Sequence, residues 1–195
     1  MSSATAEWAK DDTRAIVLVE GITDRIALET LAARHGRDLD GEGVRIVPIG
    51  GAQAIGRCLA RYGASGSETK LAGLCDVGEE NVFRRALERA GFGSGLTRPE
   101  MEALGFHVCV RDLEDELIRA VGSTAVEALL DEHGDLHAFR TFQKQPAWRR
   151  GSLDRQLRRF LCSSGRRNVR YPRILAEAVE LNRVPRPLDG VLASV

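Results

Sequence analysis

The chain has 195 residues, 43% of them hydrophobic, which is enough for one compact core without disulfide or metal staples. No run approaches the roughly 18 apolar residues of a membrane helix, and the polar segment Met1–Asp12 lacks the apolar centre of a signal peptide. We therefore expect a cytoplasmic protein with no membrane partner.

The four cysteines are far apart in the sequence and form no CxxC pair. They are Cys58, Cys75, Cys109 and Cys162. This spacing argues against a zinc site or a disulfide framework, so we expect reduced and mostly buried thiols.

Short apolar runs alternate with amphipathic segments in the first part of the chain. The predicted strands are Ala15–Val19, Val44–Ile49, Leu71–Cys75 and Phe106–Val110. The predicted helices run from Thr23 or Asp24 to Gly36, from Gln53 to Tyr62, from Glu80 to Ala90, and from Leu113 to Val121. This repeated strand–helix order predicts an α/β fold with a mainly parallel four-stranded sheet sandwiched by helices.

No further strand is predicted after Ser123. Helices are expected at Thr124–His133, Leu153–Cys162 and Arg173–Leu181, and the proline-rich Val184–Leu188 is expected to pack as a tail. We therefore divide the chain into a flexible segment (1–14), an α/β domain (15–122) and a helical basic extension packed on the core (123–195).

Acidic residues follow three of the four predicted strands. They are Glu20 and Asp24 after the first, Asp76, Glu79 and Glu80 after the third, and Asp112, Glu114, Asp115 and Glu116 after the fourth. Open parallel sheets bind ligands at the carboxyl ends of their strands, so these side chains are expected at one edge. Crowded carboxylates repel each other unless a cation neutralises them, and Mg²⁺ (or Mn²⁺) suits such oxygen ligands.

An alternative reading is that these acids only cap helices and complement the helix dipole. That interpretation is natural for Asp24, Glu80 and Asp115, which fall at predicted helix starts. It suits Glu20 less well, because Glu20 lies between a buried strand and a glycine, where burying an unused carboxylate is costly.

The net charge of zero hides a segregation along the chain. Between Asp76 and Asp135 there are 14 acidic and 6 basic residues, whereas between Arg140 and Arg173 there are 11 basic and one acidic. The candidate phosphate-binding residues are Lys144, Arg149, Arg150, Arg155, Arg158, Arg159, Arg166, Arg167 and Arg170. Interleaved with Phe142, Trp148 and Tyr171, they favour DNA as a partner. A solvated basic face, or salt bridges to the acidic region, is the alternative.

The segment VLVEGITDRIALETLA (Val17–Ala32) closely resembles the opening motif of Toprim domains, in which a hydrophobic strand ends in Glu-Gly with an Asp shortly after. Other motifs resemble the OLD (overcoming lysogenization defect) endonuclease branch of that family. They are VPIGGA (Val47–Ala52), GLCDVGEE (Gly73–Glu80), VRDLEDELIRAVG (Val110–Gly122) and FRTFQKQPAW (Phe139–Trp148). The resemblance covers essentially the whole chain and implies the Rossmann-like Toprim fold.

The resemblance also implies roles for individual residues. Glu20 would be a metal ligand or general acid/base, with Asp24 and Asp76 as ligands or supports. Glu114 would serve a second metal, and Lys144 would be a positive group near the scissile phosphate. Where the family often has Asp-x-Asp, this chain has Asp76-Val77-Gly78. Glu79 or Glu80 could supply the missing carboxylate, or one metal position could be weakened.

These features together predict a nuclease that hydrolyses DNA with two Mg²⁺ or Mn²⁺ ions about 3.5–4 Å apart. Glu80 and Asp112 complete the predicted ligand set. Tyr62 and Tyr171 lack a topoisomerase context and are expected to pack or stack.

Two other functions remain open. One is a non-cleaving Toprim module that binds nucleic acid or a partner protein. The other is a nucleotide-binding regulatory domain, against which the absence of GxGxxG counts. Since the sequence has no GxxxxGK[ST] motif, an ATPase or other subunit would be a separate partner, and a homo-oligomer is also compatible.

Overall fold

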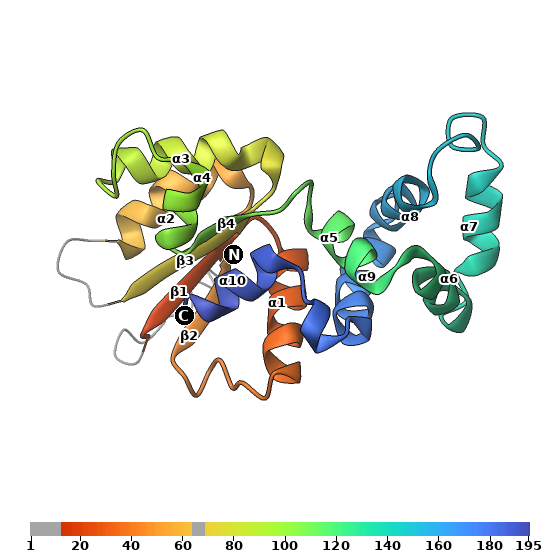
Figure 1. Ribbon diagram of the computed structural model, residues 1–195, viewed down its shortest axis with the longest axis horizontal. Coiled ribbons are helices and arrows are strands. Elements are labelled where there is room, and N and C mark those ends of the chain that lie inside the picture. Colours follow the sequence, from red (N-terminus) through yellow and green to blue (C-terminus); the bar gives the residue numbers. More distant parts are fainter. Residues whose placement is uncertain (1–12, 64–68) are drawn as a thin grey trace, which may run out of the picture.

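The computed structural model describes residues 13–63 and 69–195, so the predicted flexible segment 1–14 lies almost wholly outside the described residues. Its centre is a four-stranded sheet in the order β2-β1-β3-β4, with every neighbouring pair parallel (Figure 1). The strands are β1 (Ala15–Val19), β2 (Val44–Pro48), β3 (Lys70–Cys75) and β4 (Phe106–Val108). The predicted α/β class with a parallel four-stranded sheet is confirmed.

Helices cover both faces of this sheet (Figure 1). The alternation of β1 sends Val17 and Val19 into the core beside α1, and Ile16 and Leu18 into the core beside α2 and α3. The helices of the first half are α1 (Ile22–Arg34), α2 (Ile55–Tyr62), α3 (Glu80–Arg89) and α4 (Arg98–Ala103). Two short 3₁₀ turns, η1 (Ala52–Ala54) and η2 (Val77–Glu79), follow β2 and β3.

The second half of the chain is helical and extends to one side of the sheet (Figure 1). Its elements are α5 (Leu113–Val121), α6 (Ser123–Glu132), α7 (Leu136–Gln143), α8 (Leu153–Cys162), α9 (Gly165–Ala178), η3 (Leu181–Arg183) and α10 (Arg186–Ala193). The chain then returns to the core: α9 packs along α1, and α10 packs against β3 and β4. The Arg34 guanidinium joins these parts by donating to the carbonyl oxygen of Ala176 at 2.8 Å.

The C-terminal elements differ from the sequence-based expectation. The helix predicted at Arg173 begins at Gly165 and runs through Pro172, which is buried within it. The expected tail at Val184–Leu188 instead starts α10, with Pro187 in the first turn, where a missing N–H costs nothing. Helices α4 and α7 were not predicted, although Thr97 and Glu100 form a capping box at the start of α4.

The cysteines Cys58, Cys75, Cys109 and Cys162 are free; Cys75 and Cys109 are buried as expected, whereas Cys58 and Cys162 are partly exposed. Tyr171 is buried, and its hydroxyl donates to Asp135 at 2.9 Å, so it packs inside the protein. In the described part of the chain, no helix is long and apolar enough to cross a membrane.

The contact between α10 and β4 is centred on His107, which is buried and lies 3.3 Å from the Ser194 hydroxyl. Burial lowers the pKa of His107, which favours the neutral imidazole. A Cβ added to Gly190 of α10 would come within 2.6 Å of the imidazole Nδ1. Glycine therefore allows α10 to approach the sheet closely.

This close approach predicts that Gly190→Ala lowers the free energy of unfolding by about 1–3 kcal/mol, the usual cost of overpacking a core. In an open helical position the same change stabilises by up to about 1 kcal/mol. Gly56→Ala in α2, where an added Cβ meets nothing within 4 Å, is the matched control. Urea unfolding followed by circular dichroism measures both; equal effects would contradict the tight fit at Gly190.

Candidate metal centre

A pocket of about 260 Å³ opens where β1 and β3 end. From β1 the chain crosses to β2 on one side, and from β2 it crosses back past β1 to β3 on the other side. The carboxyl ends of β1 and β3 therefore form the topological switch point at which open α/β sheets bind ligands. The residues that line it are Glu20, Gly21, Thr23, Asp24, Gly51, Asp76, Leu113 and Glu114. Four of the six predicted metal ligands are thus brought together.

Glu20 and Asp76 meet directly across the two neighbouring strands. The backbone N–H of Asp76 donates to Glu20 Oε1 at 2.9 Å, which ties the first carboxylate to the end of β3. Because this bond uses one oxygen and a backbone donor, Glu20 Oε2 and the whole Asp76 carboxylate remain available to a ligand.

Asp24 both caps α1 and faces the pocket. Its Oδ2 accepts the N–H of Gly21 at 2.8 Å, and only 8% of the residue is exposed. The cap predicted from the sequence therefore exists, with Gly21 rather than Thr23 or Asp24 as the N-cap residue. The Asp24 carboxylate can therefore cap α1 through Oδ2 and still offer its other oxygen to a metal ion, since the cap does not use that oxygen.

The carboxylates of the pocket concentrate negative charge that no salt bridge among the described residues neutralises. Burial, followed by the charges of Glu20 and Asp112, raises the pKa of Asp76 to about 8. Burial, followed by the charge of Glu20, raises the pKa of Asp24 to about 7. Burial also raises the pKa of Glu20 and of Glu114. Among the described residues none of these four carboxylates forms an ion pair, although the charge of Arg158, which pairs with Asp112, opposes the rise at Glu114.

The other two predicted ligands, Glu80 and Asp112, are held by arginines. Glu80 is paired with both Arg84 and Arg98. Asp112 caps α5 by accepting the N–H of Asp115 at 3.0 Å, and its second oxygen is bound by Arg158. Their charges are already neutralised, so the structure does not leave them free for an ion.

The remaining acids fit a hard divalent cation by their chemistry, because all offer carboxylate oxygens and the pocket has room for water. Residues 13–63 and 69–195 contain no group of three or more acidic, histidine or cysteine side chains spaced to hold one ion directly. Mg²⁺ commonly keeps several waters and binds through one or two carboxylates, which suits this wider spacing.

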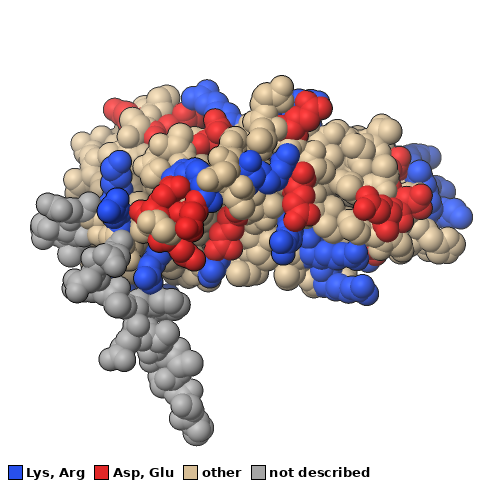
Figure 2. Space-filling model, turned by 90° about the horizontal axis from the view of Figure 1, so that it is seen from below, with Lys and Arg blue, Asp and Glu red and all other residues tan. Residues whose placement is uncertain are grey.

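The basic stretch separates into paired and unpaired side chains. Arg140 pairs with Glu127, Arg158 with Asp112, and both Arg167 and Arg170 lie near Asp135. On the face shown in Figure 2, acidic and basic side chains are interspersed along the molecule. These four arginines are therefore paired with acidic residues, as in the salt-bridge alternative.

A smaller group of cations surrounds Trp148. Its indole stacks on Phe142 with ring centroids 5.4 Å apart, and the guanidinium groups of Arg155 and Arg159 lie 5.7 and 5.9 Å from its centroid. Arg149, Arg150 and Lys144 are exposed nearby in the sequence. We call the six residues Lys144, Trp148, Arg149, Arg150, Arg155 and Arg159 the Trp148 surface.

Lys144 is exposed at the end of α7 and does not line the carboxylate pocket. The charge of Arg158, by contrast, acts on a pocket residue, since it opposes the rise in the pKa of Glu114. Sequence reasoning missed Thr23, Leu113 and Gly51 as pocket residues. The Gly50-Gly51 pair of the VPIGGA motif forms a turn, in which the Gly51 N–H donates to the Glu20 carbonyl oxygen at 3.1 Å.

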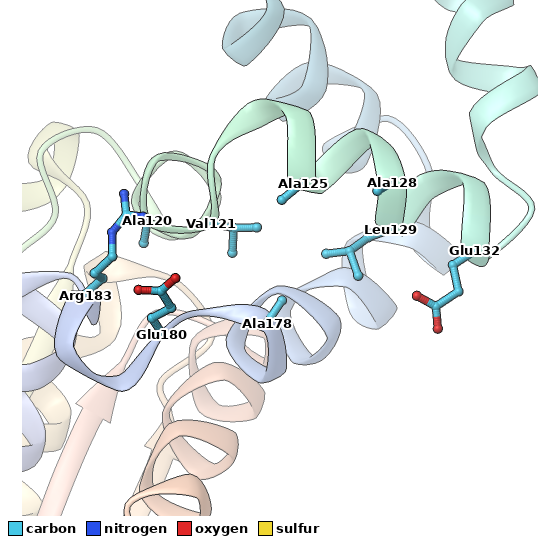
Figure 3. A pocket seen from close by; sticks show the side chains of 9 residues that line it. All are labelled: Ala120, Val121, Ala125, Ala128, Leu129, Glu132, Ala178, Glu180 and Arg183. Atoms are coloured by element: carbon cyan, nitrogen blue, oxygen red, sulfur yellow. The ribbon is translucent and has the colours of Figure 1, made fainter.

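A larger cavity of about 340 Å³ lies elsewhere, between the α5–α6 region and the end of α9 (Figure 3). Small apolar side chains such as Ala125 and Ala178 line most of it, and Glu132, Glu180 and Arg183 supply its charged side chains. It contains none of the predicted site residues. Size therefore does not identify the functional pocket here, and the chemistry of the lining points to the smaller one.

Comparison with known families agrees with this geometry. Residues 13–76, which include β1, β3, Glu20 and Asp76, match the model of the "Overcoming lysogenization defect protein-like, TOPRIM domain" family. This segment of the chain is therefore similar to the Toprim domain of OLD-like proteins. No curated protein matches the sequence significantly.

Solved structures extend the likeness beyond the matched segment. The C-terminal region of the Burkholderia pseudomallei OLD protein superposes with a TM-score of 0.72 at 18% identity, covering 93% of this chain and 96% of that one. The C-terminal region of the Xanthomonas campestris pv. campestris OLD protein gives 0.71 at 20% identity, covering 94% and 92%. The sheet and the helical half therefore share the fold of these regions.

From the raised pKa values of the pocket acids we predict how the stability of the protein depends on pH in EDTA. Asp24 and Asp76 have folded pKa values raised to about 7 and 8, so the folded state holds more protons than the unfolded state above about pH 4. The free energy of unfolding should therefore fall as pH rises from 5 to 8. Asp76→Asn should flatten this fall and gain on the order of 1–2 kcal/mol at pH 8 by removing like-charge repulsion. Thermal unfolding at several pH values measures it.

The same variant should lose stabilisation by Mg²⁺ or Mn²⁺. Binding to the folded state alone contributes about 2.7 kcal/mol at 100 times the dissociation constant. Glu132→Gln, which removes an exposed carboxylate outside the pocket, is the control and should leave both responses unchanged. An Asp76→Asn protein that is less stable than wild type in EDTA at pH 8 would argue against crowded charge in the pocket.

Proposed function

We propose that this protein is a Mg²⁺-dependent nuclease that hydrolyses phosphodiester bonds in DNA. The observation that carries the proposal is the meeting of Glu20, Asp24, Asp76 and Glu114, from three strand ends, in one pocket without ion pairs among the described residues. The OLD-like Toprim match supports it, because that family is one of nucleases.

The four pocket carboxylates have different roles in the proposed reaction. Asp24, Asp76 and Glu114 hold divalent cations, directly or through water, and Glu20 shares this task. When bound, such ions would polarise the scissile phosphate and lower the pKa of an attacking water. Glu20 Oε2 is free to take a proton from that water, since Oε1 is fixed by the Asp76 N–H.

Arginine side chains complete the proposed substrate path. Arg158 is held in place by the buried carboxylate of Asp112 at the start of α5, beside the pocket, so it presents a fixed cation to the phosphate. The exposed cations of the Trp148 surface would bind phosphates further along the strand. Lys144 belongs to that surface, and its role at the scissile phosphate stays a prediction.

The location, metal ions and partners of the protein are proposed on the same grounds. We expect a cytoplasmic enzyme that acts on DNA with two Mg²⁺ or Mn²⁺ ions, and that joins an ATPase or other protein subunit, or a second copy of itself. The matched structures are C-terminal regions of OLD proteins, so in those proteins another region precedes the matched fold.

If the proposal holds, the purified protein should nick supercoiled plasmid with Mg²⁺ or Mn²⁺ and should stop when EDTA is added. Glu20→Gln should lower the nicking rate at least about 100-fold, because it removes both a ligand and the proton acceptor. Agarose-gel assays measure the rate, and circular dichroism checks the fold.

Glu132→Gln again serves as the control and should nick at the wild-type rate. Nicking that persists in EDTA, or that survives Glu20→Gln, would point to a contaminant or to another site. A wild-type protein that binds metal and DNA without cleaving it would favour the alternative of a binding module, for which Gly78 in place of an acid is the supporting observation.

The Trp148 surface has its own test. Arg155→Ala combined with Arg159→Ala should weaken binding of an oligonucleotide in Ca²⁺ and reduce the salt dependence of the affinity by one to two ions, since each phosphate contact contributes about 0.7–0.9. Arg173→Ala is the matched control, because Arg173 is exposed in the same basic stretch but paired with Glu177. Fluorescence anisotropy across a salt series measures the affinity of both variants. If the affinity of the double variant and of the control depends equally on salt, the Trp148 surface does not bind the oligonucleotide.

A further inference from the structure

We propose that three exposed apolar side chains beside the carboxylate pocket contact an unstacked base of the substrate, so that DNA unpaired at the cleavage point is preferred over intact duplex. The three residues are Ile22, Val77 and Val110, and we call them the apolar rim. The inference rests on the proposed nuclease function and deepens it by naming the form of DNA that the site accepts.

The apolar rim is concentrated at the edge of the sheet that carries the pocket. Five large apolar residues are exposed in the described part of the chain, and three of them form the rim: Ile22 is 48%, Val77 41% and Val110 61% exposed. Ile22 comes two residues after Glu20, Val77 directly follows Asp76, and Val110 lies two residues beyond the end of β4. Single exposed apolar residues are ordinary, but three that follow neighbouring strand ends indicate a binding surface.

Hydrogen bonds join the backbone segments that carry the rim. The Asp76 N–H donates to Glu20 Oε1 at 2.9 Å, so the residues that follow β3 lie against the end of β1. The next N–H, that of Val77, donates to the carbonyl oxygen of Arg111 at 3.3 Å, and Arg111 directly follows Val110. The rim is therefore fixed next to the pocket before any substrate binds.

The position of the rim identifies what covers it. A protein bound permanently over this edge would close the pocket to any substrate, so under the proposed function the substrate itself is the occupant. When the scissile phosphate lies at Glu20 and Asp76, the sugar and base joined to that phosphate extend over the residues that follow the same strand ends. These residues include Ile22 and Val77.

The chemistry of DNA then favours an unpaired strand. In a duplex the apolar base faces are stacked on each other, and phosphates and sugars form the outer surface, from which aliphatic side chains gain little. Aliphatic side chains pack instead on a free base face or enter an opened base step. A substrate that is already single-stranded also avoids the cost of unpairing. Trp148 of the proposed path suits the same form, because aromatic rings stack on unpaired bases.

The first experiment compares three forms of one oligonucleotide, cleaved by the full chain with Mn²⁺: the single strand, the duplex, and a duplex with a central unpaired bubble. The single strand and the bubble should be cleaved at least about 10-fold faster than the duplex, because no base pair has to open. Cuts in the bubble substrate should fall within the unpaired region. Denaturing gels give both the rate and the position of cleavage.

The second experiment changes the rim. Val77→Ser combined with Val110→Ser should lower kcat/KM for the single strand about 10-fold, and for the duplex by much less, because a base contact is lost. The same variant should bind the single strand more weakly in Ca²⁺, measured by fluorescence anisotropy without cleavage. Val169→Ser combined with Leu181→Ser is the matched control, since these residues are 48% and 41% exposed and do not line the pocket. The control should behave as wild type, and circular dichroism checks that both variants fold.

A wild-type protein that cleaves the duplex as fast as the single strand would overturn the inference and leave the proposed nuclease function standing. So would a rim variant that keeps the wild-type preference. A wild-type dimer that the rim variant converts to a monomer in light scattering would show that the rim binds a second copy instead of a base. If no substrate is cleaved, the proposed function fails, and the Ca²⁺ experiment decides the inference: unchanged binding by the rim variant rejects it, and weakened binding of the single strand alone supports it.

Discussion

The site depends on one constraint: buried and partly buried carboxylates meet at the end of a parallel sheet, and no cationic side chain among the described residues pairs with them. The bond from the Asp76 N–H to Glu20 Oε1 fixes the geometry, because it joins the residues directly after β1 and β3. The two strands are neighbours in the sheet, so the contact follows from the strand order itself. Charge crowding is thus imposed by the fold, and it costs stability unless a ligand relieves it.

The cost is informative because arginines neutralise other buried or partly buried acids nearby. Asp112 is bound by Arg158, Glu80 by Arg84 and Arg98, and Glu116 by Arg119 together with the Val110 N–H at 2.6 Å. The pocket acids differ from these neighbours, because no arginine among the described residues pairs with them. A chain that needed only helix caps and core packing could have placed arginines there as well.

Sequence reasoning found the strands and pocket acids because both are local signals. A β-branched run followed by Glu20-Gly21 marks a strand end, and parallel strands deliver their ends to one edge. The Arg158–Asp112 pair joins residues 46 apart, and nothing local to either residue distinguishes it from a surface charge. The same holds for α9, where tertiary packing against α1 carries the helix through Pro172 despite the local propensity.

The helical half also explains how a small α/β sheet can present both a metal pocket and a phosphate path. The first two residues of helix α5, Leu113 and Glu114, line the pocket, and its cap Asp112 binds Arg158 of α8. One residue along α8, Arg159 stacks on Trp148 with Arg155. A single helix therefore links the acids that would hold cations to the cations that would hold a strand. The two charge types lie side by side rather than in separate domains, so the net charge of zero is compatible with binding a polyanion.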